Sequence, residues 1–105
     1  MRLQNTFVHH VFFYLKRNNA GNLQGLVEGL KRLSAASTIK QFHIGIPANT
    51  NRDVVERSYH VSWLVLFDNA ADQDSYQTDP VHLKFIKECS HFWNKVVVYD
   101  SITAG

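Results

Sequence analysis

Apolar and polar residues alternate in four segments of the chain, and apolar residues recur every three or four positions in two others. Alternation of β-branched and aromatic side chains is typical of strands, whereas the longer period is typical of amphipathic helices. The pattern predicts strands at residues 6–15, 38–48, 58–67 and 96–102. It predicts helices at residues 23–36 and 80–93, with a shorter helical stretch at residues 68–77. The elements therefore follow the order β-α-β-β-α-β.

This order is that of the ferredoxin-like split unit, an α+β fold in which helices cover one face of an antiparallel sheet. The first and third predicted strands carry apolar side chains on both faces, above all in their second halves. A strand that is exposed to water on one face alternates with polar residues, so we expect both faces of these strands to be covered. Helices can cover only one of them. The sequence thus predicts a homodimer built sheet face to sheet face, as a dimeric α/β barrel.

The composition excludes several kinds of partner. The 105 residues carry 11 Lys and Arg against 9 Asp and Glu, with no basic cluster larger than Lys16-Arg17, so we expect neither nucleic acid nor membrane as a partner. The longest uncharged stretch, residues 3–15, is too short to span a bilayer, and the N-terminus lacks the features of a signal peptide. A single cysteine, Cys89, cannot form a disulfide framework. We expect one cytoplasmic domain over residues 1–105.

The segment from Tyr76 to His82 combines a helix start with side chains suited to proton transfer. Pro80 fits the first position of a helix, and Asp79 then serves as its N-cap. His82 lies on the apolar stripe of that helix, so its imidazole should point inward, where the phenol of Tyr76 can meet it. A phenol and an imidazole can act as an acid–base pair near neutral pH. The plainer interpretation is that both residues are amphipathic and close the edge of the core.

Metal and cofactor signatures are missing from the sequence. The six histidines form no HExxH motif and no finger-like spacing with cysteine, and His9 and His10 point to opposite faces of a strand. There is also no glycine-rich phosphate loop and no GxSxG motif. We therefore predict no metal and no cofactor, and interpret Cys89 as a small buried hydrophobic residue.

Several aromatic residues can line a pocket for a flat apolar ligand if a cavity of a few hundred cubic ångströms opens beside Tyr76 and His82. Without such a cavity the same residues are ordinary core residues. They are Phe13, Tyr59, Trp63, Phe92 and Trp93.

Four stretches of the sequence together resemble the stress-responsive A/B barrel (Dabb) family. They are FVHHVFFYLK near the start, LVLFDNAAD after the third predicted strand, YQTDPVHLKF at the turn and FWNKVVVYDS near the end. The most specific part is a Y-x-x-H-P-x-H pattern, represented here by Tyr76, Asp79, Pro80 and His82. The resemblance covers nearly the whole chain and implies a ferredoxin-like domain that pairs into a dimeric α+β barrel.

The resemblance also implies roles for individual residues. Most members of the family have no assigned reaction, but the chain is similar to the plant olivetolic acid cyclase, which closes a polyketide ring without a metal or organic cofactor. The acid–base pair of that enzyme carries over onto Tyr76 and His82, and its pocket histidine on the first strand carries over onto His9. Asp79 stands where the family pattern has its first histidine, so we expect it to change the charge and hydrogen bonding of the pocket.

Three hypotheses about function are open at this point. The first is a Dabb protein that binds a small apolar or aromatic molecule and acts as a cofactor-free lyase or cyclase with Tyr76 and His82 as catalytic residues. Its substrate-binding residues would be His9, Phe13, Trp63 and Asp79. The second is a stress-protective structural dimer without chemistry, which predicts a filled interior at the turn. The third, by analogy of fold, is a relative of cofactor-free monooxygenases or heme-degrading enzymes.

Overall fold

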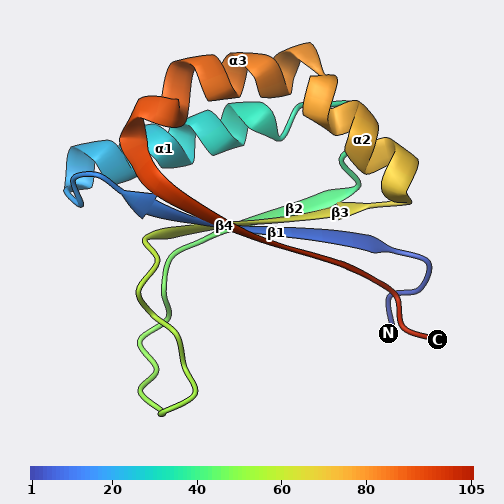
Figure 1. Cartoon of the computed structure of the whole chain (residues 1–105), viewed down its shortest axis with the longest axis horizontal. Helices are drawn as coiled ribbons and strands as arrows, with labels where there is room; N and C mark the ends of the chain where they lie inside the picture. Colours follow the sequence, from blue (N-terminus) through green and yellow to red (C-terminus); the bar gives the residue numbers. More distant parts are fainter.

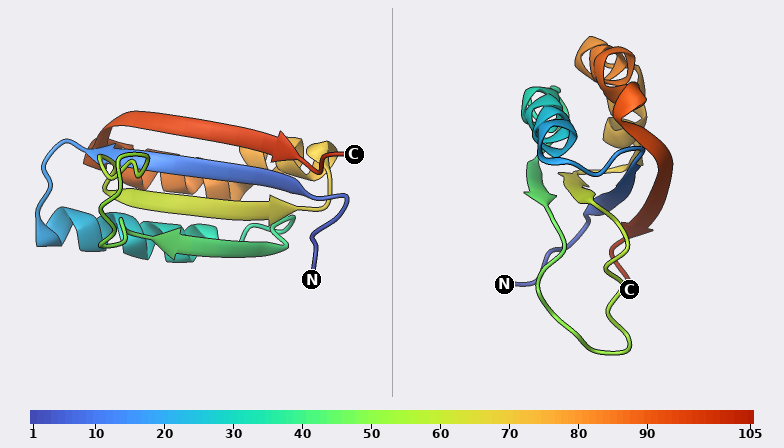
Figure 2. Two further views of the ribbon diagram at one scale, coloured as in Figure 1. Left: turned by 90° about the horizontal axis from the view of Figure 1, so that it is seen from below. Right: turned by 90° about the vertical axis from the view of Figure 1, so that its left-hand side faces the viewer.

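The computed structural model describes all 105 residues and has the predicted order of elements. Along the chain these are β1 (Phe7–Leu15), α1 (Ala20–Leu33), β2 (Gln41–Gly45), β3 (Val61–Phe67), α2 (Ala70–Thr78), α3 (Pro80–Cys89), a 3₁₀ turn (Ser90–Phe92) and β4 (Trp93–Ile102). The strands form one antiparallel sheet in the order β2-β3-β1-β4. All helices lie on one face of this sheet (Figures 1 and 2). The ferredoxin-like α+β fold is therefore confirmed.

Several boundaries differ from the prediction, among them the shorter β2 and β3, and three of the differences have a local reason. Helix α1 begins at Ala20, earlier than expected, because the Asn19 side chain accepts a hydrogen bond from the Asn22 N–H and caps it. Helix α3 ends at Cys89 because the next residues form the 3₁₀ turn. Strand β4 already begins at Trp93, since an irregularity in its pairing with β1 places Trp93 opposite Leu15.

The core lies between the helices and the sheet. Strand β1 is central, with β3 and β4 as its neighbours, and its alternate residues Val11, Phe13 and Leu15 point toward the helices and are buried. Helix α1 contributes leucines at helical spacing, and β3 is buried along nearly its whole length. The buried cluster comprises Val11, Phe13, Leu15, Leu26, Leu30, Leu33, Ala36, Val61, Trp63, Val65, Phe67, Tyr76, Phe85 and Cys89.

Helix α1 approaches α3 closely because two glycines of α1 lie on the side that faces α3 and the turn after it. A Cβ atom on Gly29 would collide with the sulfur of Cys89, and one on Gly25 would lie 2.5 Å from the Phe92 ring. The missing side chains therefore let the backbone of α1 pack directly against these two residues. Cys89 is buried among them, and burial raises the pKa of its thiol. Its predicted character as a small buried hydrophobic residue agrees with this packing.

The opposite face of the sheet has no helix on it, and we call it the open face (Figure 2). The connection between β2 and β3, residues 46–60, extends on this side (Figure 1). Phe12 contacts Tyr59 and Tyr99 there, with ring centroids 4.9 and 6.0 Å apart, and Tyr99 is 66% exposed. The open face on β1, β3 and β4 carries the apolar and aromatic side chains Val8, Phe12, Tyr14, Leu64, Leu66, Val97 and Tyr99, together with the polar side chains His10, Ser62, Lys95 and Ser101. The two-sided apolar character of β1 is thus present, and no helix covers the second side.

The helices are short. The longest, α1, has 14 residues, and no helix is long and apolar enough to cross a membrane.

Candidate functional site

A cavity of about 450 Å³ lies between the sheet and helices α2 and α3. Most of its wall is apolar: Val11, Phe13, Leu33, Trp63, Phe85, Ile86, Trp93, Val96 and Val98. The remaining lining residues are His9, Gln73, Tyr76, Gln77, His82 and Asp100. No lysine or arginine is among them. The cavity thus combines an apolar interior with a small number of polar groups, which is the usual make-up of a small-molecule site.

Tyr76 lies near the end of α2. Its side chain points from the sheet-facing side of that helix into the core. It is 1% exposed, and its hydroxyl oxygen accepts a hydrogen bond from the indole N–H of Trp63 at 3.1 Å. Burial raises the pKa of the Tyr76 phenol to about 12, although the Trp63 hydrogen bond acts in the opposite direction. Tyr76 is therefore a neutral phenol at physiological pH and can donate its proton in a hydrogen bond.

His82 lies on the first turn of α3, at the edge of the same cavity. Its ring centroid is 4.6 Å from that of Tyr76, so the predicted pair is brought together. The Nδ1 atom lies 3.2 Å from the carbonyl oxygen of Gln77. Because a carbonyl only accepts, Nδ1 carries a proton and the lone pair of the neutral ring is on Nε2. Burial lowers the pKa of His82, which keeps the imidazole in its basic form at neutral pH.

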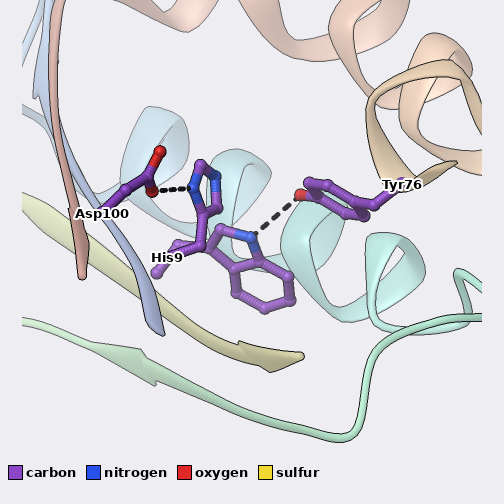
Figure 3. A network of polar contacts seen from close by, with 4 residues as sticks. His9, Tyr76 and Asp100 are labelled. Carbon is purple, nitrogen blue, oxygen red and sulfur yellow. Dashed lines mark hydrogen bonds and ion pairs between the residues drawn. The ribbon is translucent and has the colours of Figure 1, made fainter. Parts of the chain in front are cut away.

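His9 is the third residue of the site and is buried on the helix-facing side of β1. Its Nδ1 donates to Oδ1 of Asp100 at 2.7 Å, and its ring centroid is 5.9 Å from that of Tyr76. Figure 3 shows Asp100 on one side of the His9 ring and Tyr76 on the other. The carboxylate fixes the orientation of the imidazole and leaves Nε2 available to the cavity.

Asp100 is the member of the site that sequence reasoning missed. It stands directly opposite His9 in the antiparallel pairing of β1 with β4. The sequence contained a signal for this contact, because the first and last strands of the predicted fold are neighbours. To find it, one must also know the register, that is, which residues of the two strands stand opposite each other. One position of error in that register would have turned Asp100 to the other face.

Asp79 does not line the cavity, contrary to its predicted role in substrate binding. Its Oδ1 accepts the N–H of Val81 at 2.8 Å, which is the predicted N-cap of α3. Its Oδ2 accepts both the N–H and the hydroxyl of Ser37, at 3.2 and 3.3 Å. These hydrogen bonds, led by that from Val81, lower the pKa of Asp79. The carboxylate is thus directed at the backbone of the start of α3 and at Ser37 in the segment that follows α1.

Of the five aromatic residues considered as pocket candidates, three line the cavity: Phe13, Trp63 and Trp93. Tyr59 lies on the open face against Phe12, and Phe92 packs on Gly25. The ring of Trp93 stacks on Phe85 with centroids 5.7 Å apart. The cavity therefore has an aromatic wall at the side where β4 begins.

The other histidines lie away from the cavity. His43 and His91 are exposed, and His60 accepts the N–H of Leu15 through Nδ1 at 2.8 Å, at the end of β1. His10 is on the open face, and burial, followed by the nearby His43, lowers its pKa. No three His, Cys, Asp or Glu side chains are arranged to hold a metal ion.

The sequence was compared with models of known protein families and with curated proteins. The model of the stress responsive A/B barrel domain matches residues 7–103 of the chain. A comparison with curated proteins finds no significant match.

Solved structures with a similar fold include proteins of known and unknown function. A Dabb family protein with a ferredoxin-like fold from Mesorhizobium loti is 23% identical, with a TM-score of 0.77 over 95% of this chain and 98% of that one. The hydroxynitrile lyase from Passiflora edulis is 21% identical, with a TM-score of 0.76 over 94% of each chain. A dimeric protein of unknown function from Bacteroides fragilis is 19% identical, with a TM-score of 0.73 over 97% and 100%. At these identities the likeness establishes the shared fold.

Proposed function

The chain belongs to the stress responsive A/B barrel (Dabb) family, and we propose that it binds a small neutral molecule in its cavity and acts on it as a cofactor-independent lyase or cyclase. The observation that carries this proposal is the cavity of about 450 Å³ in which Tyr76, His82 and His9 meet. A structural dimer without chemistry requires a filled interior at this place. A relationship to monooxygenases or heme-degrading enzymes has no support beyond the fold.

The make-up of the cavity supports a neutral ligand with an apolar or aromatic body. Its volume lies within the range of about 300–1,000 Å³ that is usual for ligand pockets. Trp93 and Phe13 offer aromatic surface to such a body. No lysine or arginine is present to pair with an anion, whereas Asp100 would repel one. A carbonyl or hydroxyl oxygen on the ligand can meet the polar groups.

The polar groups support proton transfer at an oxygen-bearing carbon. Tyr76 is a neutral donor that can bind the oxygen, and His82 has a free Nε2 lone pair that can take a proton. His9, held by Asp100, can orient the ligand from the opposite side. For a hydroxynitrile, His82 would remove the hydroxyl proton while the carbon–carbon bond to cyanide breaks. The protonated imidazole would then return this proton to the leaving cyanide, so that a carbonyl compound and HCN form. The fold shared with a hydroxynitrile lyase makes this a suitable first reaction to test.

Benzaldehyde and benzoate test the ligand class, because they have similar bodies but differ in charge. We expect binding of benzaldehyde to change the fluorescence of Trp63 and Trp93, which both line the cavity, and benzoate to bind at least about tenfold more weakly. Equal binding of both, or binding of neither, would contradict the neutral-ligand proposal.

Cleavage of mandelonitrile, followed by the absorbance of benzaldehyde, tests the chemistry. We expect His82→Ala and Tyr76→Phe each to lower kcat/KM by about 100-fold, the usual effect of losing a general base or an oxyanion donor. His91→Ala is the matched control, because His91 is an exposed histidine outside the cavity. If both cavity variants retain the wild-type rate, the assigned acid–base pair is wrong.

A homodimer that pairs through the open face is the second part of the proposal. Its support is the row of half-buried apolar and aromatic side chains on β1, with Leu64 on β3, that no helix covers, together with the dimeric state named for similar folds. The partner copy would cover Leu64 and Phe12 and complete the barrel. The cavity lies on the other side of the sheet and is formed within one chain.

A further inference from the structure

Trp63 contacts Tyr76, one member of the proposed acid–base pair, from a different element of the fold. It lies on β3, 13 positions before Tyr76, and both side chains are 1% exposed. Its indole N–H donates to the Tyr76 hydroxyl oxygen at 3.1 Å, as one of the dashed contacts in Figure 3. The Phe42 ring lies against the indole from β2, with centroids 5.5 Å apart. The indole is thus held in one place by the sheet.

The hydrogen-bonding capacity of the two groups determines where the Tyr76 proton can go. An indole N–H only donates, whereas a phenol has one proton to donate and lone pairs that accept. Trp63 therefore occupies a lone pair of the Tyr76 oxygen and cannot receive its proton. No protein group accepts that proton in the structure. Because Tyr76 lines the cavity, the proton is available to a group bound there.

We propose that Trp63 is a positioning residue, whose indole N–H holds the Tyr76 oxygen so that the single hydroxyl proton is presented to the oxygen of a ligand in the cavity. The ligand part of this statement rests on the proposed function, but the arrangement of the two side chains does not. The same N–H stabilises negative charge on the phenol oxygen, so it also makes Tyr76 a stronger donor.

Fluorine NMR of protein labelled with 3-fluorotyrosine tests the arrangement without any ligand. The Tyr76 signal among the four tyrosines is the one that Tyr76→Phe removes. We expect Trp63→Phe, which keeps an aromatic ring but loses the N–H, to raise the pKa of Tyr76 by about 1, the equivalent of one hydrogen bond. Trp93→Phe makes the same chemical change in the same cavity and should leave the pKa of Tyr76 where it is. An unchanged or lower pKa in Trp63→Phe would overturn the proposal, as would an equal rise in Trp93→Phe.

A second measurement covers the case in which Trp63→Phe does not fold. In labelled wild-type protein, the indole N–H resonance of Trp63 should shift with the ionisation of Tyr76, and that of Trp93 should not. Trp93→Phe identifies which of the two tryptophan signals is which. If neither indole, or both, follow Tyr76, the hydrogen bond does not exist in solution.

The carbonyl stretching band of bound benzaldehyde separates this inference from the proposed function. We expect the band to lie lower in wild type than in Tyr76→Phe, with Trp63→Phe between them, because a hydrogen bond weakens the carbonyl bond. If benzaldehyde binds with the same band in all three proteins, the ligand class stands and the presentation of the proton by Trp63 is wrong. If benzaldehyde does not bind, the ligand proposal is wrong, and the fluorine experiment still decides the arrangement.

Discussion

His9 and His10 are neighbours on β1, yet they belong to two very different surfaces. His9 is 7% exposed on the helix-facing side, where Asp100 orients its ring beside the cavity. His10 is half-buried on the open face, with its ring centroid 4.3 Å from that of Phe12. Every polar group of the candidate site lies on the first of these sides.

The comparison teaches that one face of the sheet is completed within the chain and the other is not. On the helix-facing side, helices cover apolar side chains and leave a defined cavity. On the open face, apolar and aromatic side chains are only partly buried by their own neighbours, and such surfaces in monomers are small or mark an interface. In the proposed function the first face carries the chemistry and the second the association.

A charge at the centre of the open face is the strongest way to break this comparison. Leu64 lies between His10 and His43 in the pairing of the strands, and we expect Leu64→Arg to weaken dimerisation by about 100-fold or more, because an unpaired charge would be buried. Light scattering should then give the mass of one chain, 12.1 kDa, with unchanged circular dichroism. Leu83→Arg, on the exposed side of α3, is the control and should remain dimeric. A wild-type mass of 12.1 kDa at micromolar concentration would remove the dimer altogether.

A methyl group added between α1 and α3 should destabilise the packing on the helix-covered face and leave the open face unchanged. Gly29→Ala places its Cβ against the sulfur of Cys89, and we expect it to lower the free energy of unfolding in urea by about 1–2 kcal/mol, after the gain in helix propensity. Gly21→Ala, where the nearest atom would be 3.6 Å away, should be neutral or stabilise by up to about 1 kcal/mol. Adding Cys89→Ala should restore part of the loss. Dimerisation should be the same in all of these variants.

The smallest of the three effects is the loss of folding stability that we expect at alkaline pH. Because burial raises the pKa of Tyr76 from 10.0 to about 12, the unfolded chain loses this proton first, and the stabilisation is complete below pH 10 and lost as pH rises toward 12. At pH 11 the expected loss is about 1.4 kcal/mol relative to pH 9. Tyr76→Phe should be less stable at both pH values but should show less of this decline. An equal decline in both proteins would mean that Tyr76 titrates normally.

The apolar periodicity was sufficient to predict the fold and the apolar character of β1 on both faces. It placed Tyr76 and His82 at one turn and separated His9 from His10, and the structure brings Tyr76, His82 and His9 to one cavity. These features depend on local spacing, because the position of a residue along its helix or strand determines the face on which its side chain lies. Asp79 was correctly predicted as a helix cap, but its role in the pocket was not, because the cap geometry itself turns the carboxylate away from the cavity.

Local spacing alone determined which residues are turned inward and that one sheet surface lacks a cover. Only the tertiary structure decided which inward residues touch: Asp100 on His9 through the pairing of the first and last strands, and Trp63 on Tyr76 across the space between sheet and helix. The reason is physical. Periodicity records the direction of each side chain relative to its own element, whereas a hydrogen bond between elements depends on their register and separation, which are set by the packing of the whole core.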